Sequence, residues 1–170
     1  QDQNEVRVIK AIGAGAGGVG SVLQLDSPLS FYHYGGSEYQ TEVGLLSRRI
    51  VFSGDAQSDA ENFGGHTRVL GEGRFSGVQT RRMGQTNVLG KYPFHFHAMG
   101  PSNTSFIRDC SIWDSYFRCI AIHATNDSQA LRNVVFNATA HCYYLEDGIE
   151  EGNVINYNLA VKINTIGTPM

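Results

Sequence analysis

The second half of the sequence repeats a short apolar segment at nearly constant spacing, and this repeat restricts the fold more than any other feature. The segments are FSGVQTR from Phe75, IRDCSIW from Ile107, LRNVVFN from Leu131 and VINYNLA from Val154. The last three begin 24 and 23 residues apart. Short strands at this period predict a parallel β-helix, because a single coil cannot bury its inner face unless it stacks on the next. An antiparallel sandwich is the alternative, but it needs hairpin turns about every 8 to 12 residues.

Aligning the segments predicts which side chains stack. Ile112 should lie over Phe136 in the core, and Arg108 should lie beside Arg132 on the outside. The chain has 20 glycines and no useful i, i+3, i+4, i+7 apolar stripe, which favours an all-β structure. The polar turn positions are expected at Gly77, Asp109, Asn133 and Asn156.

Composition limits the class of protein. With 41% hydrophobic and 17% charged residues, the chain is typical of a globular protein. Its formal net charge of -3 gives no indication of a nucleic-acid partner, and no apolar run is long enough to cross a bilayer. We expect residues 1–170 to form a single parallel β-helix domain, a fragment of a longer protein, with 1–41 as a less regular edge and 42–162 as its coils.

A second strand can be aligned in each coil. YPFHFH ends at His97, RCIAIH at His123 and HCYYLE at Glu146, so the strand ends are 26 and 23 residues apart. Because side chains alternate between the two faces of a strand, these three residues should form one outward column. The neighbouring columns are Phe96, Ile122 and Leu145 in the core, and His95, Ala121 and Tyr144 outside, where the small Ala121 should leave a dip.

One hypothesis for this outward cluster is the active site of an enzyme that cleaves a polysaccharide, the substrate class that the family resemblance described below implies. Glycoside hydrolysis needs a general acid and a second carboxylate. Glu146 is the candidate acid and Asp147 the second carboxylate, while His97 and His123 would position the sugar or relay protons. The residues expected to flank the substrate are His95, Tyr144, Arg118 and His141.

The same cluster also has the composition of a metal site. Imidazole nitrogens and a carboxylate suit zinc, iron or copper. The predicted ligands are His95, His97, His123 and Glu146. Calcium prefers oxygen ligands and would be expected at Asp147, Glu150 and Glu151.

Two other interpretations stay open. A polar outer face is normal on a β-helix, so the cluster is also compatible with simple solvation. Alternatively, the chain is a non-catalytic adhesion or receptor module that binds an acidic glycan. The arginines considered for that surface are Arg48, Arg49, Arg81, Arg82, Arg108 and Arg132.

Five motifs follow one another along the chain: EVGLLSRRIVF (42–52), FGGH (63–66), RMGQTNVLGKYPFHFHAMG (82–100), SIWDSYFRCIAIH (111–123) and HCYYLEDGIEEGNV (141–154). Together they resemble the β-helix region of a family that includes the cell-migration-inducing hyaluronan-binding protein, the cell-surface hyaluronidase and the fibrocystin-like proteins. The resemblance implies a right-handed parallel β-helix in an extracellular or cell-surface glycoprotein. For some members it implies binding and depolymerisation of hyaluronan with a calcium dependence, and for fibrocystin-like members a receptor role.

The chain departs from the family pattern at two places. The family tends to have Ser-Arg-Asn where this chain has Ser-Arg-Arg at 47–49, and histidines where this chain has Trp113 and Asp114. The resemblance therefore leaves catalytic activity open.

The cysteines and glycosylation motifs give two further expectations. Cys119 and Cys142 should lie side by side on successive coils without a disulfide, because parallel Cβ vectors fit its dihedral angle poorly. Three Asn-x-Ser/Thr motifs favour a glycosylated protein, with Asn103, Asn126 and Asn137 as the sites.

Overall fold

The computed structural model describes residues 3–167, which form two compact units, divided after Glu42. The first unit contains an antiparallel hairpin of β1 (Ile9–Ala14) and β2 (Ser21–Leu25). Residues 15–20 of the glycine-rich stretch connect the two strands and include the short 3-10 helix η1 (Ala16–Gly18).

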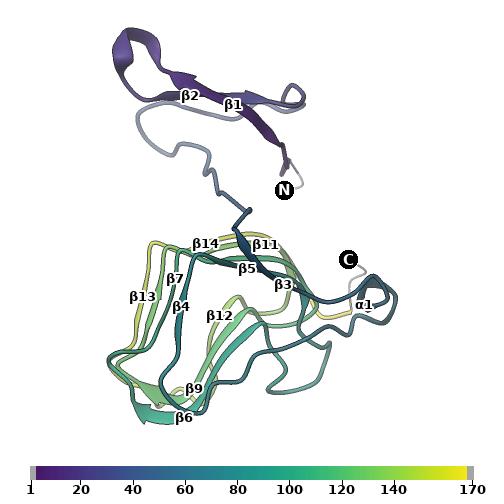
Figure 1. Cartoon of the computed structure of the whole chain (residues 1–170), viewed down its shortest axis with the longest axis vertical. Helices are drawn as coiled ribbons and strands as arrows, with labels where there is room; N and C mark the ends of the chain where they lie inside the picture. Colours follow the sequence, from purple (N-terminus) through teal and green to yellow (C-terminus); the bar gives the residue numbers. More distant parts are fainter. Residues whose placement is uncertain (1–2, 168–170) are drawn as a thin grey trace. The chain divides into compact units, whose positions relative to one another are not determined.

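The second unit is a parallel β-solenoid with three sheet faces, which Figure 1 shows in cross-section. Its first face consists of β4 (Arg74–Ser76), β7 (Phe106–Arg108), β10 (Gln129–Leu131) and β13 (Val154–Asn156). Its second face consists of β3 (Ile50–Ser53), β5 (Val78–Met83), β8 (Ser111–Ser115), β11 (Val134–Thr139) and β14 (Leu159–Asn164). Its third face consists of β6 (Phe94–Pro101), β9 (Ile120–Asn126) and β12 (Tyr143–Leu145). A single turn of helix, α1 (Ser58–Glu61), follows β3. The prediction of an all-β parallel β-helix is confirmed.

The predicted register of the third face is also confirmed. Phe96 pairs with Ile122, and Ile122 with Leu145, while His97 pairs with His123. Phe96 and Ile122 are buried in the core, but Leu145 is 40% exposed because β12 is an edge strand of this face.

The predicted register of the second face is wrong by one residue at β11. Ile112 pairs with Val135, and Phe136 pairs with Trp113 instead. Ile112 and Val135 are both fully buried, whereas Phe136 is half-buried. A further shift follows in the next coil, where Leu131 pairs with Asn156 rather than with Val154.

Asn133 explains the first of these shifts, because its side chain points inward instead of forming the turn. Asn133 is fully buried. Its Oδ1 accepts a hydrogen bond from the backbone amide of Cys110 at 3.0 Å, and its Nδ2 donates to the carbonyl of Ile107 at 2.9 Å. The side chain of Asn158 bonds the amide of Asn133 in the same way, at 2.9 Å. These asparagines link successive coils from within, where a buried backbone group needs a partner.

The corner between the first and second faces lies one residue earlier in that coil than the sequence predicts. It is occupied by four residues with φ between 52° and 64°, namely Gly77, Asp109, Arg132 and Tyr157. The predicted ladder of Arg108 and Arg132 is therefore wrong, since Arg132 turns the corner and binds the carboxylate of Asp109 at 2.7 Å.

The two aligned cysteines lie side by side, as predicted. The Sγ atoms of Cys119 and Cys142 are 3.4 Å apart without a disulfide, and both residues are buried. Burial and the neighbouring thiol raise the pKa of Cys119. We therefore expect both residues to act as core packing.

Candidate active site

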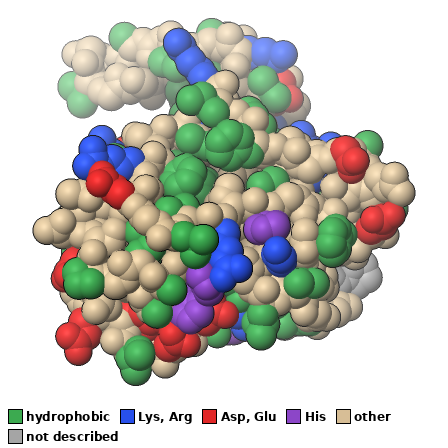
Figure 2. Space-filling model, turned by 60° about the horizontal axis from the view of Figure 1, so that its bottom comes forward, with side chains coloured by type: hydrophobic (Ala, Val, Ile, Leu, Met, Phe, Trp, Pro, Cys, Tyr) green, Lys and Arg blue, Asp and Glu red, His purple; other side chains and the backbone are tan. Residues whose placement is uncertain are grey.

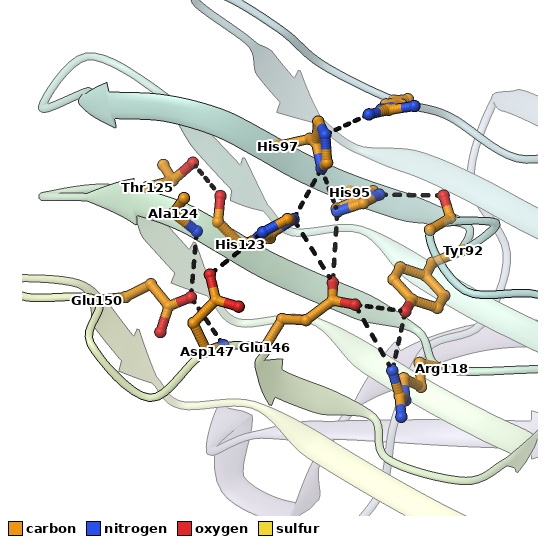
Figure 3. A network of polar contacts seen from close by, with 12 residues as sticks. Tyr92, His95, His97, Arg118, His123, Ala124, Thr125, Glu146, Asp147 and Glu150 are labelled. Atoms are coloured by element: carbon orange, nitrogen blue, oxygen red, sulfur yellow. Dashed lines mark hydrogen bonds and ion pairs between the residues drawn. The ribbon is translucent and has the colours of Figure 1, made fainter.

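Three histidines and two carboxylates meet on the outer side of the third face. His95 and His97 project from β6 and His123 from β9, while Glu146 and Asp147 follow the end of β12. The phenylalanines between the histidines of β6 point into the core, so strand alternation places both imidazoles outside. Figure 3 shows these side chains pointing toward one another.

His97 joins the other two imidazoles. Its Nδ1 lies 2.8 Å from His123 Nδ1 and 3.3 Å from His95 Nε2. Glu146 Oε2 lies 3.6 Å from His95 Nε2 and 4.0 Å from His123 Nδ1. On its far side, His123 Nε2 lies 3.2 Å from Asp147 Oδ2. The carboxylates of Glu146 and Asp147 thus approach opposite nitrogens of one imidazole.

His95 is the buried end of the cluster, with 1% of its surface exposed. Its Nδ1 donates to the carbonyl of Gly90 at 3.0 Å, and its ring lies 4.9 Å from that of Tyr92. Burial lowers the pKa of His95 to about 4, so the ring is neutral at pH 7. The dip expected at Ala121 is filled, since Ala121 is fully buried against Tyr92 and Phe117.

Glu146 is held from behind by Tyr92, which the strand columns did not include, and by Arg118, which the sequence predicted to flank the substrate. Tyr92 donates its hydroxyl hydrogen to Glu146 Oε1 at 3.1 Å and accepts from Arg118 Nη1 at 2.8 Å. The other oxygen, Oε2, is buried and has no hydrogen-bond partner. A buried oxygen cannot reach a polymer in solvent. Glu146 is therefore poorly placed for the general-acid role that the sequence predicted for it.

Asp147 and His123 are the accessible pair, with side chains 38% and 28% exposed, against 16% for Glu146. Strand alternation would separate Glu146 and Asp147, but β12 ends at Leu145 and the chain turns. Glu150 fixes that turn, because its Oε1 accepts hydrogen bonds from the amides of Asp147 and Ala124, each at 3.1 Å. Glu150 thus positions the loop, a role that the sequence analysis missed.

The predicted flanking residues divide into a buried and an exposed group. Arg118 is only 13% exposed and lies over the ring of Tyr144 at 4.0 Å, so it supports the site from within. His141 is exposed and stacks on Tyr144 with ring centroids 5.3 Å apart. Of the flanking residues, His141 and Tyr144 remain accessible for substrate, and Arg118 does not.

Arg68 lies at the exposed edge of the cluster and was also missed, because it belongs to no aligned strand. Its Nη2 contacts His97 Nε2. Figure 2 shows histidine side chains reaching the surface with acidic and basic side chains around them.

The donor atoms present fit a transition metal better than calcium. His95, His97 and His123 each offer a nitrogen, and these nitrogens all lie within 4.8 Å of one another. The acidic residues expected to bind calcium do not form such a group within residues 3–167. Glu150 instead binds backbone amides, and Asp147 binds His123. A calcium site made by this loop is therefore not supported.

Most of the arginines proposed as a glycan surface already have partners. Arg81, Arg82 and Arg132 each pair with a carboxylate, and Arg48 donates to the backbone carbonyl of Asp109 at 2.6 Å. These contacts favour a structural role for all four.

The three glycosylation motifs differ in accessibility. Asn103 is exposed and Asn126 is half-buried. Asn137 is 9% exposed, and its Nδ2 donates to Asp114 Oδ1 at 2.7 Å. The folded structure therefore leaves Asn103 as the most accessible of the three. No helix within 3–167 has the length and apolar character needed to span a membrane.

Comparison of the sequence with known proteins identifies the family of this chain. The sequence profile of the CEMIP β-helix matches residues 62–169. A G8 domain-containing protein of Dictyostelium discoideum is 55% identical over 99% of this chain, and communication mutant protein F of the same organism is 50% identical over 99%. A cell surface hyaluronidase of Danio rerio is 31% identical over 82% of this chain. The aligned region covers 11%, 15% and 12% of these three relatives. The chain thus belongs to the CEMIP β-helix family.

Proposed function

We propose that this β-helix is an extracellular or cell-surface module that binds an acidic polysaccharide such as hyaluronan and cleaves it at the exposed edge of the histidine cluster. The name of the Danio rerio relative supports the substrate class. The observation that carries the proposal is the accessible pair of Asp147 and His123, backed by a second carboxylate on the opposite nitrogen of His123.

Exposure decides the proposed roles. A glycosidic bond is cleaved when one group protonates the leaving oxygen and another, usually a carboxylate, stabilises or attacks the anomeric carbon. In this proposal Asp147 is the acid–base group that faces the glycosidic oxygen, and His123 Nε2 orients its carboxyl group without losing a proton. Glu146 holds the imidazoles in place. Arg68 and the exposed ring of His141 contact the acidic sugar chain.

The test follows the length of hyaluronan on a gel after incubation with the intact, metal-replete protein. Asp147→Asn and His123→Ala should each slow cleavage by about 100- to 10,000-fold, the usual cost of a lost acid or base. Glu151→Gln is the matched control. Glu151 is an exposed carboxylate of the same loop, and its backbone, not its side chain, makes the loop contact to Asn126. The Glu151→Gln variant should cleave hyaluronan at the wild-type rate.

Two outcomes would overturn parts of the proposal. Wild-type cleavage by Asp147→Asn would remove that carboxylate from the reaction. A folded wild-type protein that retains hyaluronan without shortening it would favour the second candidate, a non-catalytic adhesion or receptor module. That candidate is supported by Trp113 and Asp114. Where relatives tend to carry histidines, these two residues contact Arg81, by a ring contact at 4.6 Å and an ion pair at 3.4 Å.

A further inference from the structure

Four potential ligand atoms lie close together at the centre of the cluster. They have more lone pairs than there are hydrogens between them to form hydrogen bonds. They are His95 Nε2, His97 Nδ1, His123 Nδ1 and Glu146 Oε2. The distances recorded among them are 2.8, 3.3, 3.6 and 4.0 Å. Figure 3 shows the three rings and the carboxylate enclosing one point.

Contacts on the outer side of two of the rings, one hydrogen bond and one ion pair, indicate which nitrogen carries the hydrogen. The carbonyl of Gly90 accepts from His95 Nδ1, so the neutral ring has a lone pair on Nε2. Asp147 Oδ2 lies 3.2 Å from His123 Nε2, a contact that favours a hydrogen on that nitrogen, and the neutral form of this ring then has its lone pair on Nδ1. Glu146 Oε2 is buried with no hydrogen-bond partner. The single hydrogen of a neutral His97 cannot satisfy all three of these acceptors.

We propose that these four atoms bind one divalent transition-metal ion of the zinc class. Zinc bonds to nitrogen and oxygen at about 2.0–2.2 Å, so neighbouring ligands of a tetrahedral ion lie about 3.3 Å apart. Four of the six distances among these atoms lie on both sides of that value. The three histidine nitrogens form the compact group, all within 4.8 Å of one another, and Glu146 approaches it beside His95 and His123. Three imidazoles and one carboxylate are also ligands that zinc and its first-row neighbours accept and calcium does not prefer.

The surroundings match the outer partners that metal ligands usually have. Each ligating histidine normally donates its second N–H to a carboxylate or a carbonyl, and a ligating carboxylate is itself hydrogen-bonded. The carbonyl of Gly90 accepts from His95 and the hydroxyl of Tyr92 donates to Glu146 in this way, while Asp147 lies 3.2 Å from His123 Nε2 as an ion-pair partner.

One contact must change when the ion binds. His97 can ligate through Nδ1 only when its hydrogen is on Nε2, the atom that now contacts Arg68. Two donors cannot share that contact. Arg68 is exposed, so it can turn into solvent without breaking the core.

The test measures metal binding without any sugar. The protein is stripped with EDTA and titrated calorimetrically with zinc chloride and, separately, with calcium chloride. Cobalt(II) provides a visible-absorption readout of the ligand geometry. We expect one zinc ion per chain, with calcium at least about 100-fold weaker. Asp147→Asn should weaken zinc about 10- to 100-fold as a lost outer partner, and His97→Ala and His95→Ala should weaken it more.

His66→Ala is the control for unspecific binding to imidazole, because His66 contacts Lys91 and none of the four ligands. It should bind zinc as the wild type does. His95 is buried, so circular dichroism must confirm that each variant is folded. If His95→Ala unfolds, the partly exposed His97→Ala decides the question.

A folded wild-type protein that binds neither zinc nor cobalt would overturn the inference, as would unchanged affinity in His97→Ala. The proposal does not rest on the polysaccharide. Tight zinc binding without hyaluronan cleavage would keep the metal site and refute the depolymerase, whereas cleavage by a protein that binds no metal would do the reverse.

Discussion

Replacing Tyr92 by phenylalanine removes one hydroxyl from beneath the site and leaves the ring that packs on Phe117 and His95. The hydroxyl makes two hydrogen bonds, both with charged side chains. Bonds of this kind contribute about 1.5–3 kcal/mol each. Part of this is recovered, because Arg118 Nη1 and Glu146 Oε1 are already 3.9 Å apart and can close on each other. We expect the free energy of unfolding to fall by about 1–3 kcal/mol.

Urea unfolding measures this change, and the slope of the free energy against urea should stay constant, because the surface exposed on unfolding is the same. Tyr157→Phe is the matched control. Tyr157 is 79% exposed, so its loss of a hydroxyl should change the free energy by less than about 0.5 kcal/mol. Zinc affinity provides a second readout, which should fall about 10- to 100-fold in Tyr92→Phe alone, since Tyr92 positions Glu146. The argument is refuted if Tyr92→Phe and Tyr157→Phe have the same free energy of unfolding and Tyr92→Phe binds zinc as tightly as the wild type.

Two further predictions concern the fold. Asn133→Ala should lower the free energy of unfolding by about 2–5 kcal/mol, because it leaves a buried amide and a buried carbonyl unpaired. Arg132→Gly should change the free energy of unfolding by less than about 1 kcal/mol, because it removes an exposed ion pair but also relieves the strain of a side chain in the left-handed conformation. Equal urea midpoints for Asn133→Ala and Arg132→Gly would contradict the register. In the first unit, burial alone would raise the pKa of Glu5, but hydrogen bonds from backbone amides and an imidazole outweigh it and lower the pKa from 4.5 to about 2. The folded population of residues 3–42, followed by NMR, should therefore fall as the pH falls from about 4.5 to about 2. Glu5→Gln should weaken that dependence and leave the part that belongs to Asp26, whose pKa the amide of Val8 lowers.

The sequence predicted the solenoid and the third face because period-two alternation is strong there. In YPFHFH, phenylalanines and histidines alternate without interruption, so only one register puts the apolar side chains inside. Near Asn133 the signal is weaker. Matching residue types aligned Asn133 with Asp109 in the turn, whereas the structure buries the asparagine and turns the corner at Arg132. Asparagine suits both places, so its identity did not distinguish a turn from an internal ladder.

Only those residues of the candidate site that lie on strands could be predicted from the sequence. His95, His97 and His123 lie on aligned strands, and the alignment brought them together correctly. Tyr92 and Arg68 reach the cluster from connecting segments, for which the sequence gives no register. The roles of the two carboxylates were also beyond the pattern, because both follow the last residue of β12 and their burial depends on the turn that Glu150 holds.

The position of the cluster follows from a departure from simple solenoid architecture. The outer face of a coil normally faces water, where exposed histidines would titrate near pH 6.5 and their interactions would be weak. Here the segment that leads into β6 folds back over the third face, so Tyr92 covers Ala121 and the carbonyl of Gly90 holds His95. This cover removes water from one end of the cluster and leaves His97 and His123 partly exposed at the other. The result is one neutral, oriented imidazole inside and an imidazole–carboxylate pair at the accessible edge. The proposed ion site and the proposed sugar site therefore share His123, which belongs to both ends of the cluster.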